Sequence, residues 1–224
     1  HRIFNQNVSA TSTTEDNQEY KSFLIPIRGE LRLINEQNLK WDMGTSFQKE
    51  SMLWEAFKVQ QAQSENEMIG VFTKWEWLPM ESTSFVAGYR YDTDLNFRDV
   101  SSYQIGLTYE NYKLEHSTGY RLPSLYQLFS NKGNSDLNPE FSRNFSLSHD
   151  FIFNDAFEAS WSIFETHVDN LIAGRGNPLQ YFNVGRTLTR GIEASIYYKM
   201  DGSQKISVNM GYQEPKDINT GRWL

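Results

Sequence analysis

The side chains that could perform chemistry in this chain are few, and they do not form a known catalytic pattern. The 224-residue sequence has no cysteine, so disulfides and zinc–thiolate sites are excluded. No serine stands in a G-x-S-x-G context, and no H-x-x-x-H or EF-hand spacing offers a metal site. The histidines are His1, His116, His149 and His167. We therefore expect no catalytic residues, no bound metal and no cofactor.

One pair of carboxylates could bind a cation. Asp92 and Asp94 flank Thr93 in a segment that we expect to be a loop. Carboxylate oxygens suit calcium, so this pair could bind the ion weakly. A solvated turn is the favoured interpretation, because two acidic residues alone do not make an EF-hand loop.

The composition of the chain limits the kinds of molecule that it could bind and the way it could cross a membrane. The formal net charge is −7 and the isoelectric point is about 5.2, which disfavours nucleic-acid binding. Hydrophobic residues make up 38% of the chain and no apolar run reaches 18 residues, so a transmembrane helix is excluded. The low mean hydropathy of −0.62 does not exclude membrane strands, because only every second residue of a barrel strand faces lipid.

Two-residue alternation of apolar and polar side chains is the dominant pattern of the elements. About ten segments show it, each near the ten residues that a tilted membrane strand needs. They cover about 23–33, 39–48, 69–77, 85–92, 103–110, 112–120, 145–153, 157–163, 192–199 and 206–212. Short turns alternate with longer connections, the latter at about Lys49–Glu67, Thr93–Val100, Arg121–Arg143 and Asp169–Arg186. This rhythm predicts an all-β fold, a section of an antiparallel transmembrane β-barrel.

Aromatic residues support the barrel. They form 15% of the sequence and lie near the strand ends, where rings with polar tips prefer the membrane interface. His149 falls on the apolar face, as a lipid-facing or girdle histidine would. A large soluble β-sandwich remains the alternative, because period-two patterning does not distinguish lipid from a packed core. The fold would be a sandwich if a second protein layer buried Trp75, Ile105 and Ile196.

Two stretches resemble one protein family. Residues 119–129 read G-Y-R-L-P-S-L-Y-Q-L-F, followed by L-N-P-E at 137–140. Further on, Y-F-N-V-G at 181–185 precedes T-R-G-I-E at 189–193. In this order and spacing the stretches resemble the barrel of TonB-dependent outer-membrane receptors, with cobalamin and siderophore receptors as the nearest kinds. The motif residues are Gly119, Arg121, Pro123, Leu128, Asn138, Pro139, Glu140, Asn183, Gly185, Arg190, Gly191 and Glu193.

We expect a structural role for these motif residues rather than direct contact with a substrate. Pro123 cannot donate to a strand ladder, so it should end a strand. Gly191 lets a strand bend or pack closely. Glu140 and Arg190 are expected to pair between a loop and a strand, although exposed ion pairs contribute little.

The resemblance covers about 39–224 and implies a 22-stranded barrel with a plug inside, of which this chain supplies about ten strands. No signal peptide opens the chain and both ends read like interior sequence, so we expect residues 1–224 to be one partial barrel domain. The plug, its energy-coupling segment and the closing strand are not in the sequence. The implied location is the outer membrane of a Gram-negative bacterium.

The resemblance also implies a function, namely active uptake of a scarce nutrient such as an iron–siderophore or cobalamin. The implied partners are membrane lipid, the TonB protein (reached through an N-terminal segment) and a metal chelate or corrinoid. Loop aromatics are candidate ligand contacts, although packing between loops explains them equally well. They are Trp54, Phe57, Phe97, Tyr126, Phe129, Tyr181 and Phe182. A passive porin or structural barrel is the alternative, and an outer-membrane enzyme is disfavoured.

Overall fold

The fold was analysed in a computed structural model of the chain. It describes residues 2–6, 9–15, 18–35, 38–56, 59–94, 99–154, 156–200 and 204–223. Side chains are described within 25–33, 38–53, 63–94, 99–154, 156–200 and 204–223. Within these ranges, no helix has the length and apolar character needed to span a bilayer.

Long antiparallel strands make up nearly the whole structure. The main sheet has twelve strands. They are β1 (Arg2–Gln6), β2 (Ser9–Glu15), β3 (Gln18–Asn35), β4 (Leu39–Ala56), β5 (Val59–Met80), β6 (Thr83–Asp94), β7 (Val100–Tyr109), β8 (Tyr112–Arg121), β9 (Glu140–Asn154), β10 (Phe157–Asp169), β13 (Arg186–Lys199) and β14 (Lys205–Asp217). A short helix, α1 (Leu125–Phe129), and a hairpin of β11 (Ile172–Arg175) and β12 (Gln180–Asn183) lie in the connections.

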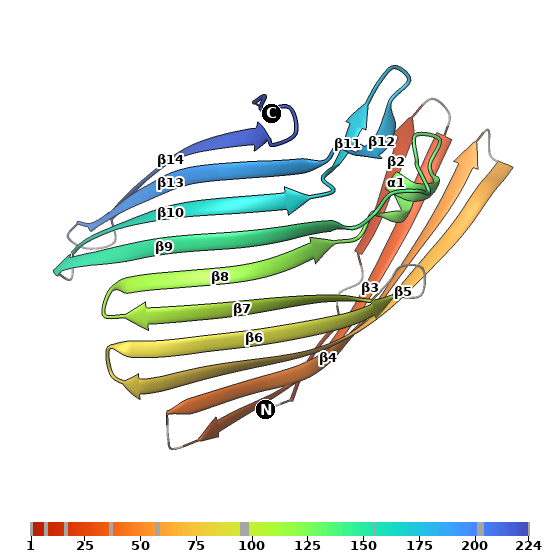
Figure 1. Cartoon of the computed structure of the whole chain (residues 1–224). Coiled ribbons are helices and arrows are strands. Elements are labelled where there is room, and N and C mark those ends of the chain that lie inside the picture. Colours follow the sequence, from red (N-terminus) through yellow and green to blue (C-terminus); the bar gives the residue numbers. More distant parts are fainter. Residues whose placement is uncertain are drawn as a thin grey trace.

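The sheet is a curved wall, and from β3 to β14 its neighbouring strands follow the order of the chain (Figure 1). β1 and β2 pair with successive parts of β3, so they extend one edge together. The other edge is β14, and the sheet is open in the part of the chain that the structure describes. The predicted all-β, antiparallel barrel section is confirmed, with two N-terminal strands beyond the ten that the alternation revealed.

The long connections contain more structure than we expected. Residues 49–56 and 59–67 are not an irregular loop, because β4 and β5 continue through them as one tall hairpin (Figure 1). The connection after β8 contains α1, and the one after β10 contains the β11–β12 hairpin. No lipid lies against a strand beyond the membrane, so such a strand lacks the regular apolar alternation that lipid imposes on its outward face.

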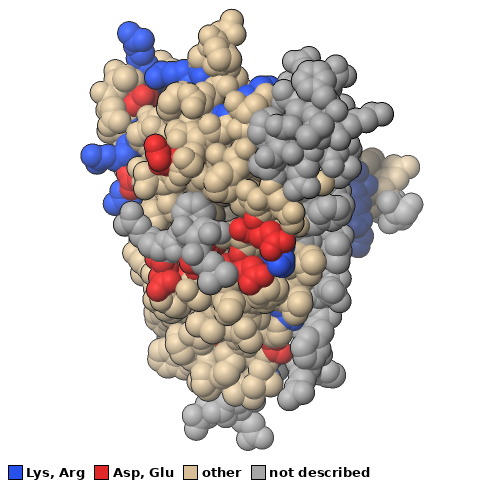
Figure 2. Space-filling view, turned by 90° about the vertical axis from the view of Figure 1, so that its right-hand side faces the viewer, with Lys and Arg blue, Asp and Glu red and all other residues tan. Residues whose placement is uncertain are grey.

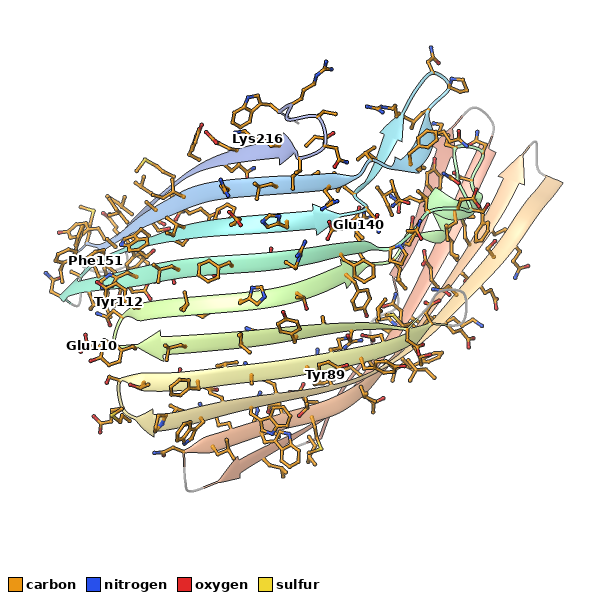
Figure 3. All side chains as sticks on the ribbon, viewed as in Figure 1. Tyr89, Glu110, Tyr112, Glu140, Phe151 and Lys216 are labelled. Atoms are coloured by element: carbon orange, nitrogen blue, oxygen red, sulfur yellow. The ribbon has the colours of Figure 1, made fainter. Side chains whose placement is uncertain are left out.

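Outward side chains are apolar through most of each strand. Trp75, Ile105 and Ile196 are 39%, 53% and 39% exposed, and no second protein layer covers them in the described ranges. The sandwich alternative is therefore wrong. Aromatic rings cluster near the short turns, where Trp77 stacks on Phe85 with centroids 5.5 Å apart. Tyr112 and Phe151 lie at this end of the sheet (Figure 3).

His149 lies outward within this aromatic zone, as expected. Its ring centroid is 4.0 Å from that of Tyr112 and 4.2 Å from that of Phe151. Its Nδ1 atom is buried and has no hydrogen-bond partner among the described residues. The histidine thus belongs to the aromatic zone near the short turns.

Inward side chains are polar and paired. Arg32 donates to both carboxylate oxygens of Asp42, at 2.6 Å and 3.2 Å. Further along the wall, Gln104 on β7 donates to Glu115 on β8 at 2.9 Å. Both signs of charge line the inner face, which matches a wet or filled interior and would be unfavourable in lipid.

The outward face becomes charged toward the long-loop end. Lys49 bridges Glu65 and Glu67, each at 3.0 Å. Five strands further along the sheet from β5, Glu165 on β10 contacts Arg190 on β13 at 2.6 Å. We name these outward charged side chains, together with Arg143, Asp169, Arg186 and the neighbouring imidazole of His167, the outer collar. Charges are unfavourable in hydrocarbon, so the collar marks the upper edge of the apolar band, and parts beyond it lie outside the membrane.

Candidate functional site

The connections beyond the collar form one packed unit, which we name the loop roof (residues 122–139 and 170–185). Figure 1 shows α1 and the β11–β12 hairpin gathered beside the tall ends of β3–β5. Figure 2 views this end, where uncharged side chains cover most of the surface that the described residues form and acidic side chains gather in a patch. A solute arriving from outside would meet this surface first.

The first part of the roof is built by the proline and by the capped helix. β8 ends at Arg121, two residues before Pro123, as the missing proline N–H requires. Ser124 then caps α1: its hydroxyl accepts from the Gln127 N–H, while the Gln127 side chain accepts from the Ser124 N–H. This reciprocal capping box satisfies two free helix donors and starts a helix of only five residues.

Helix α1 rests on the inward side of the tall β4–β5 hairpin. Leu125 is 2% exposed and packs against Met52, which is 1% exposed. Leu128 turns the other way and joins Leu137 and Ile172 in a second buried cluster. The helix therefore joins the hairpin to the rest of the roof through apolar contacts.

A half-buried carboxylate, that of Glu50, also lies under the helix. Glu50 on β4 accepts a hydrogen bond from the Leu125 N–H. Burial raises the pKa of Glu50, the nearby Asp94 raises it further, and the Leu125 hydrogen bond opposes both. The seat of α1 therefore favours the neutral form of this acid.

Asparagine side chains join the two halves of the roof. The Asn183 carbonyl accepts from the Asn138 N–H at 2.8 Å, and its amide donates to the carbonyl oxygens of Asn138 and Asn170 at 3.0 Å and 2.7 Å. Asn134 donates to the Tyr181 carbonyl at 3.0 Å. These bonds hold the β11–β12 hairpin against the segment that follows α1.

Arg121 and Glu140 join the roof to the wall. They are cross-strand partners at the tops of β8 and β9, and Arg121 donates to both Glu140 oxygens, at 2.7 Å and 2.6 Å. Glu140 is 8% exposed and also accepts from the Ile172 N–H at 2.6 Å; Figure 3 places it at the long-loop end. The hydrogen bonds to Glu140 raise the pKa of Arg121.

The expected pairing of Glu140 with Arg190 is wrong. Glu140 pairs with Arg121, and Arg190 pairs with Glu165. Each arginine lies directly opposite its carboxylate in the strand register. Direct cross-strand neighbours are close enough for such pairs, whereas Glu140 and Arg190 belong to different levels of the wall.

The Asp92–Asp94 segment is also corrected. Both residues belong to β6 rather than to a loop. Asp92 is fully buried and accepts from Arg90, whose guanidinium also donates to Ser46 at 2.8 Å. Asp94 accepts from Asn66 at 2.7 Å. In the described ranges, no three His, Cys, Asp or Glu residues are arranged to hold a metal ion.

Sequence reasoning missed the network around Asp92. Gly70 lies between Ser46 and Asp92 in the register, and a Cβ added there would stand 2.1 Å from an Asp92 oxygen. The missing side chain leaves space for Arg90 to reach across β5. Tyr120 lies against the same pair, and burial raises its pKa to about 12. The sequence contained one signal of this network, namely Gly70 at an inward position of a strand with alternating apolar and polar residues.

The three motif glycines, Gly119, Gly185 and Gly191, lie where the available space or the backbone geometry restricts substitution. Gly185 has a φ of +96°, a left-handed conformation that favours glycine. A Cβ at Gly191 would be 2.4 Å from the Phe164 ring, and one at Gly119 would be 2.9 Å from the Ser142 hydroxyl.

Two further motif residues are Glu193 and Pro139. Glu193 lies opposite Ser162 and Gly211 in the register of β13. Pro139 accepts a hydrogen bond from Asn170 through its carbonyl oxygen.

The candidate aromatic contacts fall into three groups. Tyr126 and Tyr181 meet edge to face with centroids 6.3 Å apart and pack against the roof's buried clusters. Phe129 and Phe182 are 41% and 39% exposed. Phe57, Phe97 and the side chain of Trp54 lie outside the described residues. The roof thus offers exposed rings above a polar interior, an arrangement suited to binding a solute without covalent chemistry.

Comparison with known proteins agrees with this architecture. The family described as "TonB dependent receptor-like, beta-barrel" matches residues 2–224. The chain belongs to this family. TonB-dependent receptors are transport receptors of the Gram-negative outer membrane, so this chain is a section of an outer-membrane β-barrel.

Solved structures share the fold of this TonB-dependent receptor barrel. The siderophore receptor PirA from Pseudomonas aeruginosa is 19% identical with a TM-score of 0.74, over 92% of this chain and 43% of that one. The copper transporter OprC is 16% identical with a TM-score of 0.76, over 92% and 39%. The ferric enterobactin receptor PfeA from P. aeruginosa is 18% identical with a TM-score of 0.72, over 91% and 37%. The chain spans about two-fifths of these proteins.

Proposed function

We propose that this barrel section belongs to a receptor that takes up a scarce nutrient across the outer membrane, a metal chelate or a corrinoid, with energy supplied through TonB. The observation that carries the proposal is the family match over residues 2–224. The siderophore and copper transporters that share the fold support a metal-containing cargo. The braced roof above a polar inner wall gives such a cargo a place to bind.

Within the roof, we assign the cargo contacts to the exposed rings. Phe129 and Phe182 are available to solvent, whereas Tyr126 and Tyr181 are partly buried and hold the roof together. Trp54, Phe57 and Phe97 remain candidates for the same surface. Aromatic rings contribute large apolar contact area at low entropic cost, which suits a bulky chelate.

The test is a binding titration of the full-length receptor with a ferric siderophore and with cobalamin. We expect Phe129→Ala and Phe182→Ala each to weaken the binding of the preferred ligand by roughly tenfold, in the range of one buried aromatic contact. Phe153→Ala is the matched control, because its ring is outward near a short turn and 63% exposed. Unchanged affinity in both roof variants would remove these rings from the site.

A second measurement distinguishes gated uptake from a porin. A TonB-energised receptor should conduct little steady current in a planar bilayer, and its uptake of the radiolabelled ligand should stop in cells without TonB. A steady open-channel current together with uptake that continues without TonB would favour the passive barrel instead.

A further inference from the structure

The outward wall of β5–β9 is interrupted by a groove. It has a volume of about 500 Å³ and lies over β6 and β7. Ala87 is its floor, because this small residue stands between Trp75 and Ile105 in one cross-strand row. Phe85, Leu114 and Phe145 complete the walls. Each of these side chains belongs to the apolar outward face, so lipid rather than protein surrounds the groove.

One end of the groove is polar. His116 lines it, and its Nε2 atom lies 3.2 Å from the Tyr103 hydroxyl. Arg143 precedes Phe145 by two residues on the same face of β9, about 7 Å along the strand toward the long-loop end. The groove therefore leads from the hydrocarbon zone into the outer collar.

The collar at this point has an excess of positive charge. Arg143 and Arg186 share a single carboxylate, Asp169, at 3.2 Å and 3.9 Å. The two arginine side chains are 56% and 66% exposed. Two guanidinium groups with one carboxylate carry a net charge of +1, and exposed guanidinium forks suit a phosphate.

We propose that the groove and the Arg143–Asp169–Arg186 cluster together bind one acidic, phosphate-bearing lipid of the outer leaflet. One acyl chain fills the groove over Ala87, and the phosphate contacts Arg143 and Arg186. An apolar slot next to a cationic cluster at headgroup depth is complementary to such a lipid in both shape and charge. The site is on the outside of the wall, so it would serve the receptor whichever cargo passes inside.

The test uses the full-length receptor in nanodiscs of phosphatidic acid and phosphatidylcholine with identical acyl chains. Native mass spectrometry after release into detergent measures which lipid stays bound. We expect retention of one phosphatidic acid in about tenfold preference over phosphatidylcholine, in line with a charge-assisted pair. The double variant R143Q/R186Q should reduce this preference to near unity, and Ala87→Trp should abolish retention of either lipid by filling the groove.

Matched controls separate the site from general effects on the barrel. Ala159→Trp adds the same ring to the outward face of β10, away from the groove, and Arg190→Gln removes a collar arginine that has Glu165 as its own partner. Both should retain phosphatidic acid like the parent protein. Equal retention of the two lipids by the parent, or unchanged retention by Ala87→Trp, would overturn the proposal. A dimer that Ala87→Trp dissociates would assign the groove to a second copy instead.

Discussion

At the scale of single residues, the inner wall depends on where side chains are missing. Arg90 reaches across β5 to Ser46 only because Gly70 has no Cβ. The network buries Asp92 completely, so loss of its partner would leave a buried charge unpaired, which is strongly destabilising. Glycine at this position is therefore a packing requirement rather than a site of flexibility.

Gly70→Ala should destabilise the barrel by about 1–3 kcal/mol, the usual effect of overpacking. The measurement is the free energy of unfolding of the full-length receptor in liposomes. Gly88→Ala is the control on the same inner face, because its added Cβ would have its nearest neighbour at 3.7 Å, an ordinary contact. Equal losses in the two variants would contradict the role of the Arg90–Asp92 network.

At the scale of elements, short pieces of secondary structure stabilise one another. α1 has five residues and β11 and β12 have four each, too few to be stable in isolation. These short elements are stabilised instead by helix capping, by the buried leucines and by the hydrogen bonds of Asn183 and Glu140. The loop roof is thus a tertiary structure made from connections.

Asn183→Ala should open the roof, because it removes three hydrogen bonds to the segment around Asn138 and Asn170. Each contributes about 1 kcal/mol, so protease cleavage within 122–139 and 170–185 should become roughly tenfold faster or more. Asn209→Ala on β14 is the control, with one long contact to Ser207. A cleavage rate that stays at the parent value in Asn183→Ala would show that the asparagine does not brace the roof.

The seat of α1 should respond to pH through Glu50. Because its pKa is raised in the folded state, the protonated form is favoured there, and stability falls as pH rises from the ordinary value near 4.5 through the folded pKa. Above that window the loss is complete. Hydrogen exchange of the α1 amides, corrected for intrinsic rates, should show more protection at pH 4 than at pH 7.

Glu50→Gln tests the same seat without the charge. The amide keeps an acceptor for the Leu125 N–H, so the variant should show protection at pH 7 like that of the parent at pH 4. It should also lose most of the pH dependence of these amides. Protection that varies with pH equally in both proteins would assign the effect to another group.

At the scale of the whole molecule, the direction of each side chain decides whether it meets lipid or the interior. Outward Ile196 and inward Ser195 are neighbours on β13, yet they face different surroundings. Ser195 lines an inward hollow of about 280 Å³ together with Asp150 and Glu158. The outer collar limits the apolar band on the opposite face.

Ile196→Arg should therefore destabilise the barrel by about 1–2 kcal/mol, because a basic residue on the lipid face costs about 2–4 kcal/mol at the bilayer midplane and about 0–1 kcal/mol near the interface, and Ile196 lies two residues from the ring contact of Tyr198 with Phe157. Ser195→Arg should change the unfolding free energy little, since the new charge would enter a wet hollow that contains two acids. Both are measured by unfolding of the full-length receptor in liposomes. A loss in Ser195→Arg as large as that in Ile196→Arg would contradict the assignment of lipid and interior faces.

The sequence alone determined which faces of the strands are apolar, where the short turns fall and which family the motifs resemble. Period-two alternation is imposed by a membrane outside and water inside, so it is readable wherever both surroundings act on one strand. Beyond the collar that contrast disappears, and the tall β4–β5 hairpin, α1 and the β11–β12 hairpin became visible only in the tertiary structure.

The tertiary structure likewise determined which side chains pair with one another. Arg121 rather than Arg190 meets Glu140 because the register places them opposite each other. Arg90 reaches Ser46 because a glycine lies between them. Such contacts depend on strand register and on neighbours distant in the chain, which a pattern along one segment does not encode.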